Sequence, residues 1–455
     1  MTALAGMRLG LNRQLSREVL SLATPAVAGL SFQMVVSIVN TAMVGRLEDT
    51  QVQLAALGLG FLGTWAITSL FSSLSTGTHV LTARRHGEGN DLAAGEVLNN
   101  SLVVCAILGV VFGGLGHFFS HAIIDFFSKN DAVTEAGAGY MRYQFLGLPF
   151  FLLIVSYRGF FNGIGHTKIF MFSAIIINVF NIIFNYIFIF GKLGFPRMEL
   201  AGAGLGSAAS MVLGWLFFLG VTFAPKYRKQ YKYFSHFSIS RDVIAQIVKI
   251  SVPVSLQNIL ILLGFLVFVA ITGIIGTVDQ AASQVVISGL FISLMPCFGF
   301  GIAGQTLVGQ SIGKGDEKLA HAYGYETAKL TTILTIAIGI IFVLVPDAVL
   351  LIITNNDGVI EVARPILQIA GVAQVFYGAG IIFANALQAG GSTVFVMGVE
   401  IVTHWLIFLP LTYVFGVTLH GGVKGAWLAL PVYVLAYTSM NFLKFRSVGW
   451  LRNKI

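Results

Sequence analysis

"STGTHVLTARRHGEGND" (Ser75–Asp91) returns 226 residues later in altered form as "IAGQTLVGQSIGKGDE" (Ile302–Glu317), with two pairs of glycines in register. At the same offset, "SKNDAVTE" (Ser128–Glu135) matches "TNNDGVIE" (Thr354–Glu361). Similarity at one fixed offset indicates that the chain contains two related halves. Such a duplication predicts the same local structure in each half.

The composition indicates that most of the chain faces an apolar solvent. Of the 455 residues, 56% are hydrophobic and 10% are charged, and the mean hydropathy is +0.85. Soluble domains carry about a quarter charged residues, because their surfaces face water. Backbone groups in lipid must be hydrogen-bonded internally, so long apolar segments predict helices. Twelve such segments lie at roughly residues 18–45, 53–82, 95–119, 137–160, 168–191, 200–222, 246–273, 280–306, 320–345, 360–387, 394–416 and 422–445.

Six of these segments precede the basic stretch Pro225–Asp242 and six follow it. An even number of spans keeps both halves in one orientation, so the repeats are parallel and related by an axis along the membrane normal. We therefore predict an all-α integral membrane fold of twelve transmembrane helices in two parallel six-helix repeats. Residues 1–225 are expected to form one lobe, residues 226–242 a cytoplasmic linker and residues 243–455 the second lobe. Two lobes that rock against each other expose their cleft to alternate sides, which is typical of transporters.

The 27 lysines and arginines predict the orientation. If the N-terminus is cytoplasmic, most of them fall on the cytoplasmic side, including Arg84, Arg85 and the basic residues of the linker. Positive charge concentrates on that side, so we expect both termini in the cytoplasm and the protein in the plasma (inner) membrane. The apolar stretch Val19–Gly45 is too long for the apolar region of a signal peptide and predicts the first span.

Patterns typical of enzymes, metal sites and nucleotide sites do not occur. The sequence has no CxxC, HExxH or Walker motif. Cys105 and Cys297 lie inside apolar runs and are expected to be packed thiols. The net charge of +8 comes from short loops, where it signals orientation rather than a nucleic-acid surface. We expect neither an enzyme nor a cofactor, and any uphill transport would need an ion gradient.

Five stretches spread over both halves resemble the multidrug and toxic compound extrusion (MATE) transporters. They are "VNTAMVGRL" (Val39–Leu47), "LSTGTHVLTARRHGEGND" (Leu74–Asp91), "YRGFFNGIGHTK" (Tyr157–Lys168), "NVFNIIFNYIFIFG" (Asn178–Gly191) and "HWLIFLPLTYVFG" (His404–Gly416). The resemblance spans nearly the whole chain. It implies a V-shaped, twelve-helix exporter of organic cations or drugs, driven by an inward proton or sodium gradient.

The chain departs from this family where the family usually couples transport to ions. The resemblance places an Asp of the family at Asn40 and, in one branch, a second Asp at Asn185. The sodium-associated acids of another branch would fall near Ile261 and Tyr377. The usual coupling carboxylates are therefore replaced by uncharged residues, and the sequence leaves open whether the replacements are natural or engineered.

One acidic residue, Glu400, lies well inside a predicted span. His404 follows four residues later and so shares its helix face. An ionisable group in the bilayer costs about 2.5–3.5 kcal/mol on insertion scales, so it normally faces a cavity or a partner. We predict that the pair exchanges a proton or holds a cation. The alternative is a hydrogen-bonded pair that stabilises its own helix.

Amide side chains form a second group of candidates. Asn178, Asn181 and Asn185 recur at spacings of three and four and lie on one helix face. With Asn40 and Gln33 they are predicted to line a polar pocket in the first lobe. The alternative is hydrogen bonding between helices, worth about 0.6 kcal/mol on average. Amides can ligate an ion or a drug but cannot carry a proton.

Three further amides, Gln257, Asn258 and Gln284, are predicted to face the cleft of the second lobe, with helix packing as the alternative. The leading hypothesis is a secondary active exporter of cationic drugs or toxic organic compounds, coupled to H⁺ or Na⁺ and monomeric in the lipid bilayer. Phenylalanine, methionine and amide side chains suit flat apolar cations.

Two alternatives remain. A flippase for lipid-linked precursors, a relative in the same superfamily, would favour several arginines in the cleft, and the predicted spans hold almost none mid-membrane. An integral membrane transferase would need a cluster of histidines and acids at one interface, which the sequence does not show.

Overall fold

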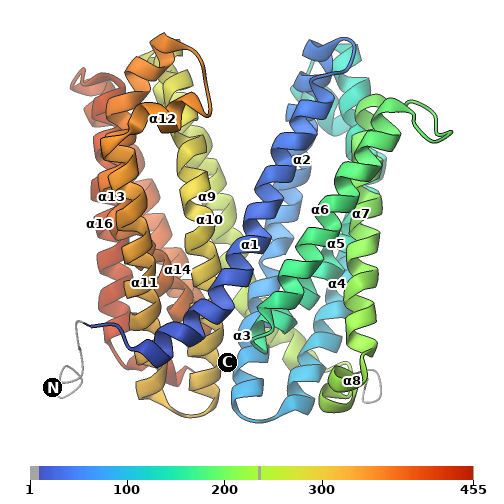
Figure 1. The fold of residues 1–455 in the computed structure, drawn as a ribbon, viewed down its shortest axis with the longest axis vertical. Helices are drawn as coiled ribbons and strands as arrows, with labels where there is room; N and C mark the ends of the chain where they lie inside the picture. Colours follow the sequence, from blue (N-terminus) through green and yellow to red (C-terminus); the bar gives the residue numbers. More distant parts are fainter. Residues whose placement is uncertain (1–9, 234–236, 454–455) are drawn as a thin grey trace. The chain divides into compact units, whose positions relative to one another are not determined.

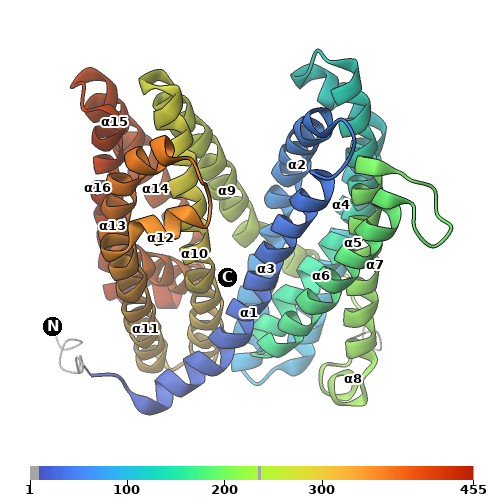
Figure 2. The same cartoon turned by 45° about the horizontal axis from the view of Figure 1, so that its top comes forward.

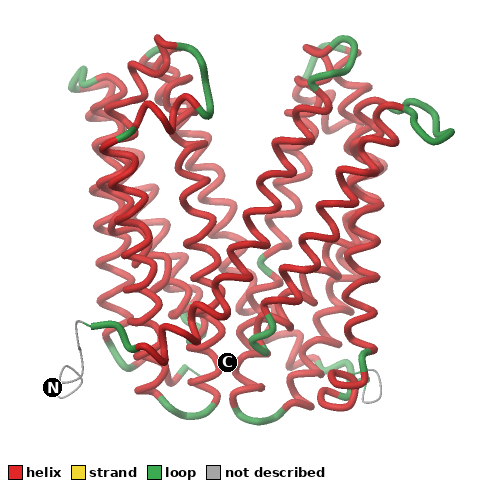
Figure 3. Tube along the Cα trace, viewed as in Figure 1, coloured by secondary structure: helices red, strands yellow, loops and turns green. Residues whose placement is uncertain are grey.

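The computed structural model describes residues 10–233 and 237–453, and these residues form helices joined by short loops, without a strand (Figure 3). The first half contains α1 (Arg13–Val44), α2 (Thr50–Ser72), α3 (Leu74–Gly87), α4 (Asp91–Phe127), α5 (Asp131–Gly163), α6 (Thr167–Phe190), α7 (Glu199–Phe223) and α8 (Pro225–Tyr231) (Figure 1).

The second half contains two π-helical segments, η1 and η2, among its α-helices. Its elements are α9 (Arg241–Ile275), α10 (Thr277–Gly313), α11 (Glu317–Leu344), α12 (Pro346–Leu351), α13 (Asp357–Ala389), α14 (Thr393–Glu400), η1 (Ile401–Phe408), α15 (Leu409–Tyr413), η2 (Val414–Thr418), α16 (Gly422–Arg446) and the short 3₁₀-helix η3 (Gly449–Arg452).

Twelve spans in the described residues are long and apolar enough to cross a membrane. Helices α2 and α3 together make one span, and the elements from α14 to η2 make another. The prediction of an all-α membrane fold with twelve spans is confirmed. Cys105 and Cys297 are both buried and free, as expected for packed thiols.

Helix ends repeat at the offset of 226 residues. Asn90 and Asp316 cap the starts of α4 and α11, and the side chain of each accepts a hydrogen bond from the backbone N–H three residues on. The residues just before them, Gly89 and Gly315, have φ values of 74° and 73°, a conformation that glycine adopts without a Cβ clash. The same local signals therefore end and restart the helices in both halves.

Close helix packing repeats at the same offset. A Cβ at Gly113 of α4 would lie 2.8 Å from the carbonyl oxygen of Phe145 on α5. A Cβ at Gly339 of α11 would lie 2.6 Å from the carbonyl oxygen of Gly371 on α13. Neither position can hold a side chain, so two backbones approach closely, as in helix association within lipid. In both halves the third span packs on the fourth and the fourth on the sixth, and Figure 2 shows α13 beside α11 and α16.

The chain divides into two compact units. Unit 1 comprises Met1–Val27 and Leu260–Ile455, and unit 2 comprises Ala28–Ile259. These units differ from the predicted lobes because α1 and α9 each begin in one unit and end in the other. Both changes of unit follow a proline within the helix, Pro25 in α1 and Pro253 in α9. Apolar patterning predicts where a helix lies along the chain, but it does not specify which helices surround each of its turns.

Candidate functional site

An amide cluster of Asn40, Asn181, Asn185 and Ser207 joins three helices within unit 2. Asn40 Nδ2 on α1 donates to Asn181 Oδ1 on α6 at 2.8 Å, and Asn185 Nδ2 donates to Asn40 Oδ1 at 2.9 Å. Asn181 Nδ2 donates to Ser207 Oγ on α7 at 3.0 Å. Because Asn181 and Asn185 are one turn apart, one face of α6 presents both amides to its neighbours.

One oxygen of the amide cluster keeps an open acceptor position. Asn185 is 0% exposed, and its Oδ1 atom has no hydrogen-bond partner among the described residues. This oxygen faces Gly206 of α7, where a Cβ would overlap it. A buried acceptor without a partner costs about 1–3 kcal/mol, a cost that a bound ligand would relieve. The four members of the cluster have no titratable side chain, so it can bind but cannot carry a proton.

Two of the predicted pocket residues lie outside this cluster. Asn178 is buried, at 8% exposure, but it makes no hydrogen bond to the cluster members. Gln33 is exposed. The structure therefore joins Asn40, Asn181 and Asn185 by hydrogen bonds. Asn178 and Gln33 do not take part in these hydrogen bonds.

An acid–imidazole cluster of Glu400, His404 and Tyr433 lies within unit 1. Glu400 Oε1 accepts a hydrogen bond from the Tyr433 hydroxyl at 3.1 Å and lies 3.3 Å from His404 Nδ1. Glu400 is 2% exposed and His404 is 8% exposed. The spacing of four residues thus places the two predicted side chains in contact. Tyr433, on α16, was not predicted from the sequence.

The helix that carries Glu400 and His404 changes its geometry between them. Glu400 is the last residue of α14, and His404 lies within the π-helix η1. Pro410 follows in α15, and its missing N–H cannot continue the hydrogen-bond ladder of an α-helix. π-Helical turns often occur at functional sites, because the extra residue per turn redirects side chains. The π-helical segment is therefore a second feature, besides the buried acid, that is typical of a functional site.

The repeat relates the hydroxyl groups of the two clusters. Ser207 of the amide cluster and Tyr433 of the acid–imidazole cluster are 226 residues apart. In each half, therefore, the fifth span presents polar side chains to a hydroxyl at the same position of the sixth span. Neither Ser207 nor Tyr433 was predicted from the sequence, and the repeat offset relates the two positions only once one of them is known.

The remaining predicted amides lie in different units. Gln257 and Asn258 belong to unit 2, and Gln284 belongs to unit 1. Gln257 is buried, whereas Gln284 is exposed and its backbone carbonyl accepts a hydrogen bond from Ser288. That all three face the cleft of the second lobe stays a prediction, and the change of unit within α9 falls just after Asn258.

Glu326 of α11 is a second buried acid, at 2% exposure, that was not predicted from the sequence. Its Oε1 atom accepts from the backbone N–H of Asn12 at 2.7 Å and from Ser16 Oγ at 2.5 Å. Its Oε2 atom pairs with Lys329 Nζ at 2.8 Å. The spacing of three between Glu326 and Lys329 was the available signal. These contacts tie the start of α1 to α11.

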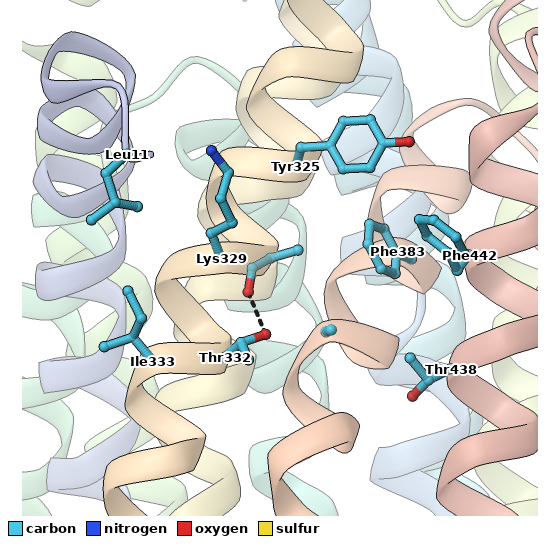
Figure 4. Close-up of a pocket in the computed structure, with 10 residues that line it drawn as sticks. Leu11, Tyr325, Lys329, Thr332, Ile333, Phe383, Thr438 and Phe442 are labelled. Carbon is cyan, nitrogen blue, oxygen red and sulfur yellow. Dashed lines mark hydrogen bonds between the residues drawn. The ribbon is translucent and has the colours of Figure 1, made fainter. Parts of the chain in front are cut away.

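A crevice of about 480 Å³ lies beside this anchor within unit 1 (Figure 4). Three aromatic side chains, Tyr325, Phe383 and Phe442, line it together with aliphatic and threonine side chains. Lys329 also lines it, but Glu326 neutralises that charge. The crevice contains none of the residues predicted as binding sites.

Comparisons of this chain with family models, with curated proteins and with solved structures all point to the same family. The MatE family model matches residues 25–187 and 253–414, one block in each half. The probable multidrug resistance protein NorM of Thermotoga maritima is 24% identical over 97% of this chain and 94% of its own length. The multidrug resistance protein NorM of Photobacterium profundum is 25% identical over 96% of each chain.

A solved structure of a MOP superfamily transporter from Pyrococcus furiosus shares the fold, with a TM-score of 0.87 at 20% identity over 97% of each chain. The family match covers most of the chain and includes Asn40 and Asn181 in its first block and Glu400 and His404 in its second. The chain therefore belongs to the MatE family of multidrug and toxic compound extrusion proteins, and it is an integral membrane transporter rather than an enzyme.

Proposed function

We propose that this chain is a secondary active exporter of organic cations or drugs, driven by an inward H⁺ or Na⁺ gradient through alternating access. The observation that carries the proposal is the family match to both halves of a twelve-span chain. The relatives from Thermotoga maritima and Photobacterium profundum are named as multidrug resistance proteins. Since the sequence has no Walker motif, an ion gradient is the expected energy source.

The amide cluster supports a binding role in unit 2. It combines amide donors and acceptors with the unpaired oxygen of Asn185. A cationic cargo gains from such an acceptor, because amide oxygens stabilise positive charge without a fixed negative charge of their own. We propose that the protein works as a monomer in the inner membrane, with both termini cytoplasmic.

Transport in proteoliposomes tests the function directly. Purified protein is reconstituted, a fluorescent organic cation such as ethidium is supplied, and a proton or sodium gradient is imposed separately. The expected result is accumulation of the cation against its gradient with one of the two ions, and collapse of that accumulation when an ionophore dissipates the gradient. Protein-free liposomes with the same gradients are the control.

A different result would overturn the proposal. Cation movement that neither gradient drives, with protein that is folded and inserted, would contradict secondary active export. In that case, transfer of fluorescent lipid analogues between leaflets in the same liposomes would favour the flippase alternative.

A further inference from the structure

We infer that Glu400, His404 and Tyr433 form a proton-exchange site through which unit 1 couples export to a proton gradient. The inference rests on the proposed function, because coupling has a meaning only if the chain exports a cargo. It assigns the task of proton transfer to the fifth span of the second half. In the equivalent span of the first half, the residues that contribute to the amide cluster, Asn181 and Asn185, are uncharged.

The surroundings of Glu400 leave its charge largely uncompensated. Its one ion pair among the described residues is with His404, and no lysine or arginine reaches it. Both of its hydrogen-bond contacts are to Oε1, and Oε2 has none in the described part of the chain. A carboxylate that is 2% exposed within a membrane span needs either a partner charge or a proton. Oε2 is therefore the open position for a proton.

The neighbouring elements supply titratable groups but no permanent charge. Tyr433 and Tyr437 approach from α16, Tyr377 approaches from α13, and Cys297 of α10 lies beside Tyr377. On α9 the neighbour is Gly264, which has no side chain. All of these groups are neutral near pH 7 in their ordinary ranges. Charge balance at Glu400 thus depends on His404 and on an incoming proton.

The hydrogen bonds of His404 indicate where the proton goes. Nδ1 faces Glu400 Oε1, so in the neutral ring Nδ1 carries the hydrogen and donates to the carboxylate. The other nitrogen, Nε2, is buried and has no hydrogen-bond partner among the described residues. A proton on Nε2 would create a buried donor without an acceptor, whereas a proton on Oε2 removes the buried negative charge. One proton from the aqueous phase therefore binds Glu400 and leaves again from Glu400, while His404 and Tyr433 hold its other oxygen in place.

A metal cation fits this site less well than a proton. Hard cations such as Na⁺ prefer several oxygen ligands. The site presents one carboxylate, tyrosine hydroxyls and an imidazole, and one of the carboxylate oxygens already accepts a hydrogen bond from Tyr433. The π-helix that begins just after Glu400 is a second, independent feature of the position, because it is a costly backbone geometry in a span that an ordinary α-helix could cross.

Infrared pH-difference spectroscopy tests protonation without requiring transport. Spectra of the reconstituted protein at about pH 8 and about pH 6 are compared, a range in which exposed carboxyls stay almost wholly ionised. The wild type is expected to show a protonated-carboxyl band that Glu400→Gln lacks. Glu361→Gln, which removes an exposed glutamate of the same unit, is the matched control and should keep the band.

Transport by the same variants tests coupling. Glu400→Gln is expected to bind the fluorescent cation with a Kd within about threefold of the wild type, because the amide keeps the side-chain volume, yet to lose proton-driven export. Tyr433→Phe removes one donor to the carboxylate, so the pH profile of export should move upward by about one unit. A purely structural role would lower the amount of folded protein without moving this profile.

Two results would overturn the inference. They are a carboxyl band that is unchanged in Glu400→Gln, and proton-driven export by Glu400→Gln at the wild-type rate. If the wild type itself shows no gradient-driven export, the proposed function and the coupling role fail together. The infrared comparison then still decides whether Glu400 is a protonation site.

Discussion

Gly264 of α9 lies directly against the imidazole of His404, and a Cβ at position 264 would overlap both Nε2 and Cδ2 of the ring. Glycine inside a helix costs about 1 kcal/mol relative to alanine. Gly264 therefore lowers the intrinsic helical stability of α9 at the position where the helix contacts the ring of His404. Gly264 offers no side chain to Nε2, which has no hydrogen-bond partner among the described residues.

Gly264→Ala should displace His404 and destabilise the protein by about 1–3 kcal/mol, the usual effect of overpacking. The measurement is thermal unfolding in detergent, combined with the pH profile of cation export. Gly398→Ala is the matched control, since a Cβ there meets nothing within 4 Å. A Gly264→Ala protein as stable as the control would show that the ring moves freely.

Asn181→Leu and Asn185→Leu should reduce export about tenfold, because each change removes hydrogen bonds of the amide cluster worth about 1–1.5 kcal/mol. Both variants should keep wild-type abundance in the membrane. Val179→Leu, an exposed position on the same helix, is the control. Export that falls only in proportion to the amount of folded protein would favour a packing role for the asparagines.

Glu326→Ala should destabilise unit 1 by about 2–4 kcal/mol, because it leaves Lys329, Ser16 and the backbone N–H of Asn12 without their shared acceptor. Tryptic cleavage near the start of α1 reports loss of this anchor, and thermal unfolding reports the stability. Lys318→Met, at an exposed position of the same helix, should behave as the wild type. Equal protection of the N-terminal segment in both variants would contradict the anchor.

Acid should loosen the contact between His166 and α8. His166 Nδ1 pairs with the Tyr227 hydroxyl at 2.7 Å. Burial, then the nearby Lys226 and His86, lower the pKa of His166 below its ordinary value of 6.5. The folded state thus binds this proton less readily than the unfolded state. The stabilising contribution is present above about pH 6.5 and is lost as the pH falls through the lowered pKa.

Thermal unfolding at about pH 7.5 and about pH 5.5 checks this prediction, since the two values bracket the ordinary histidine pKa. The drop in the unfolding midpoint should be smaller in His166→Gln than in the wild type. Tyr227→Phe should lower the midpoint more at about pH 7.5 than at about pH 5.5, because acid has already weakened the hydrogen bond that the substitution removes. Identical pH dependence in the wild type and in His166→Gln would contradict the assignment.

Much of the framework could be predicted because it depends on local patterns. Apolar length predicts each of the twelve spans, and caps such as Asn90 and Asp316 recur with the repeat. The contact between Glu400 and His404 also follows from spacing, since residues four apart face one side of a helical segment. Asn181 and Asn185 form one face of α6 for the same reason.

At one helix contact that recurs in both halves, the glycine that allows the close approach lies on a different helix in each half. The positions of this contact follow the repeat, but the exchange of the glycine was not predictable from the sequence. In the first half, Gly159 of α5 packs against the carbonyl oxygen of Ser75 on α3, where a Cβ would lie 2.6 Å away. In the second half, the equivalent positions hold Asn385 on α13 and Gly301 on α10, and the small residue has changed sides. At such a contact the two facing side chains must together fit a small space, so their combined volume is limited. Either helix can carry the glycine that meets this limit.

By itself, the sequence determined the helical class, the number of spans, the duplication and the two pairs of polar residues that share a helix face. Only the tertiary structure decided which distant groups complete them. Tyr433 bonds Glu400 from 33 residues away, Asn40 bonds Asn181 from 141 away, and the backbone of Asn12 bonds Glu326 from 314 away. A periodic pattern encodes the direction of a side chain from its own helix, because that direction depends on backbone geometry alone. The partner on another helix depends on how the helices pack, to which residues all along the chain contribute.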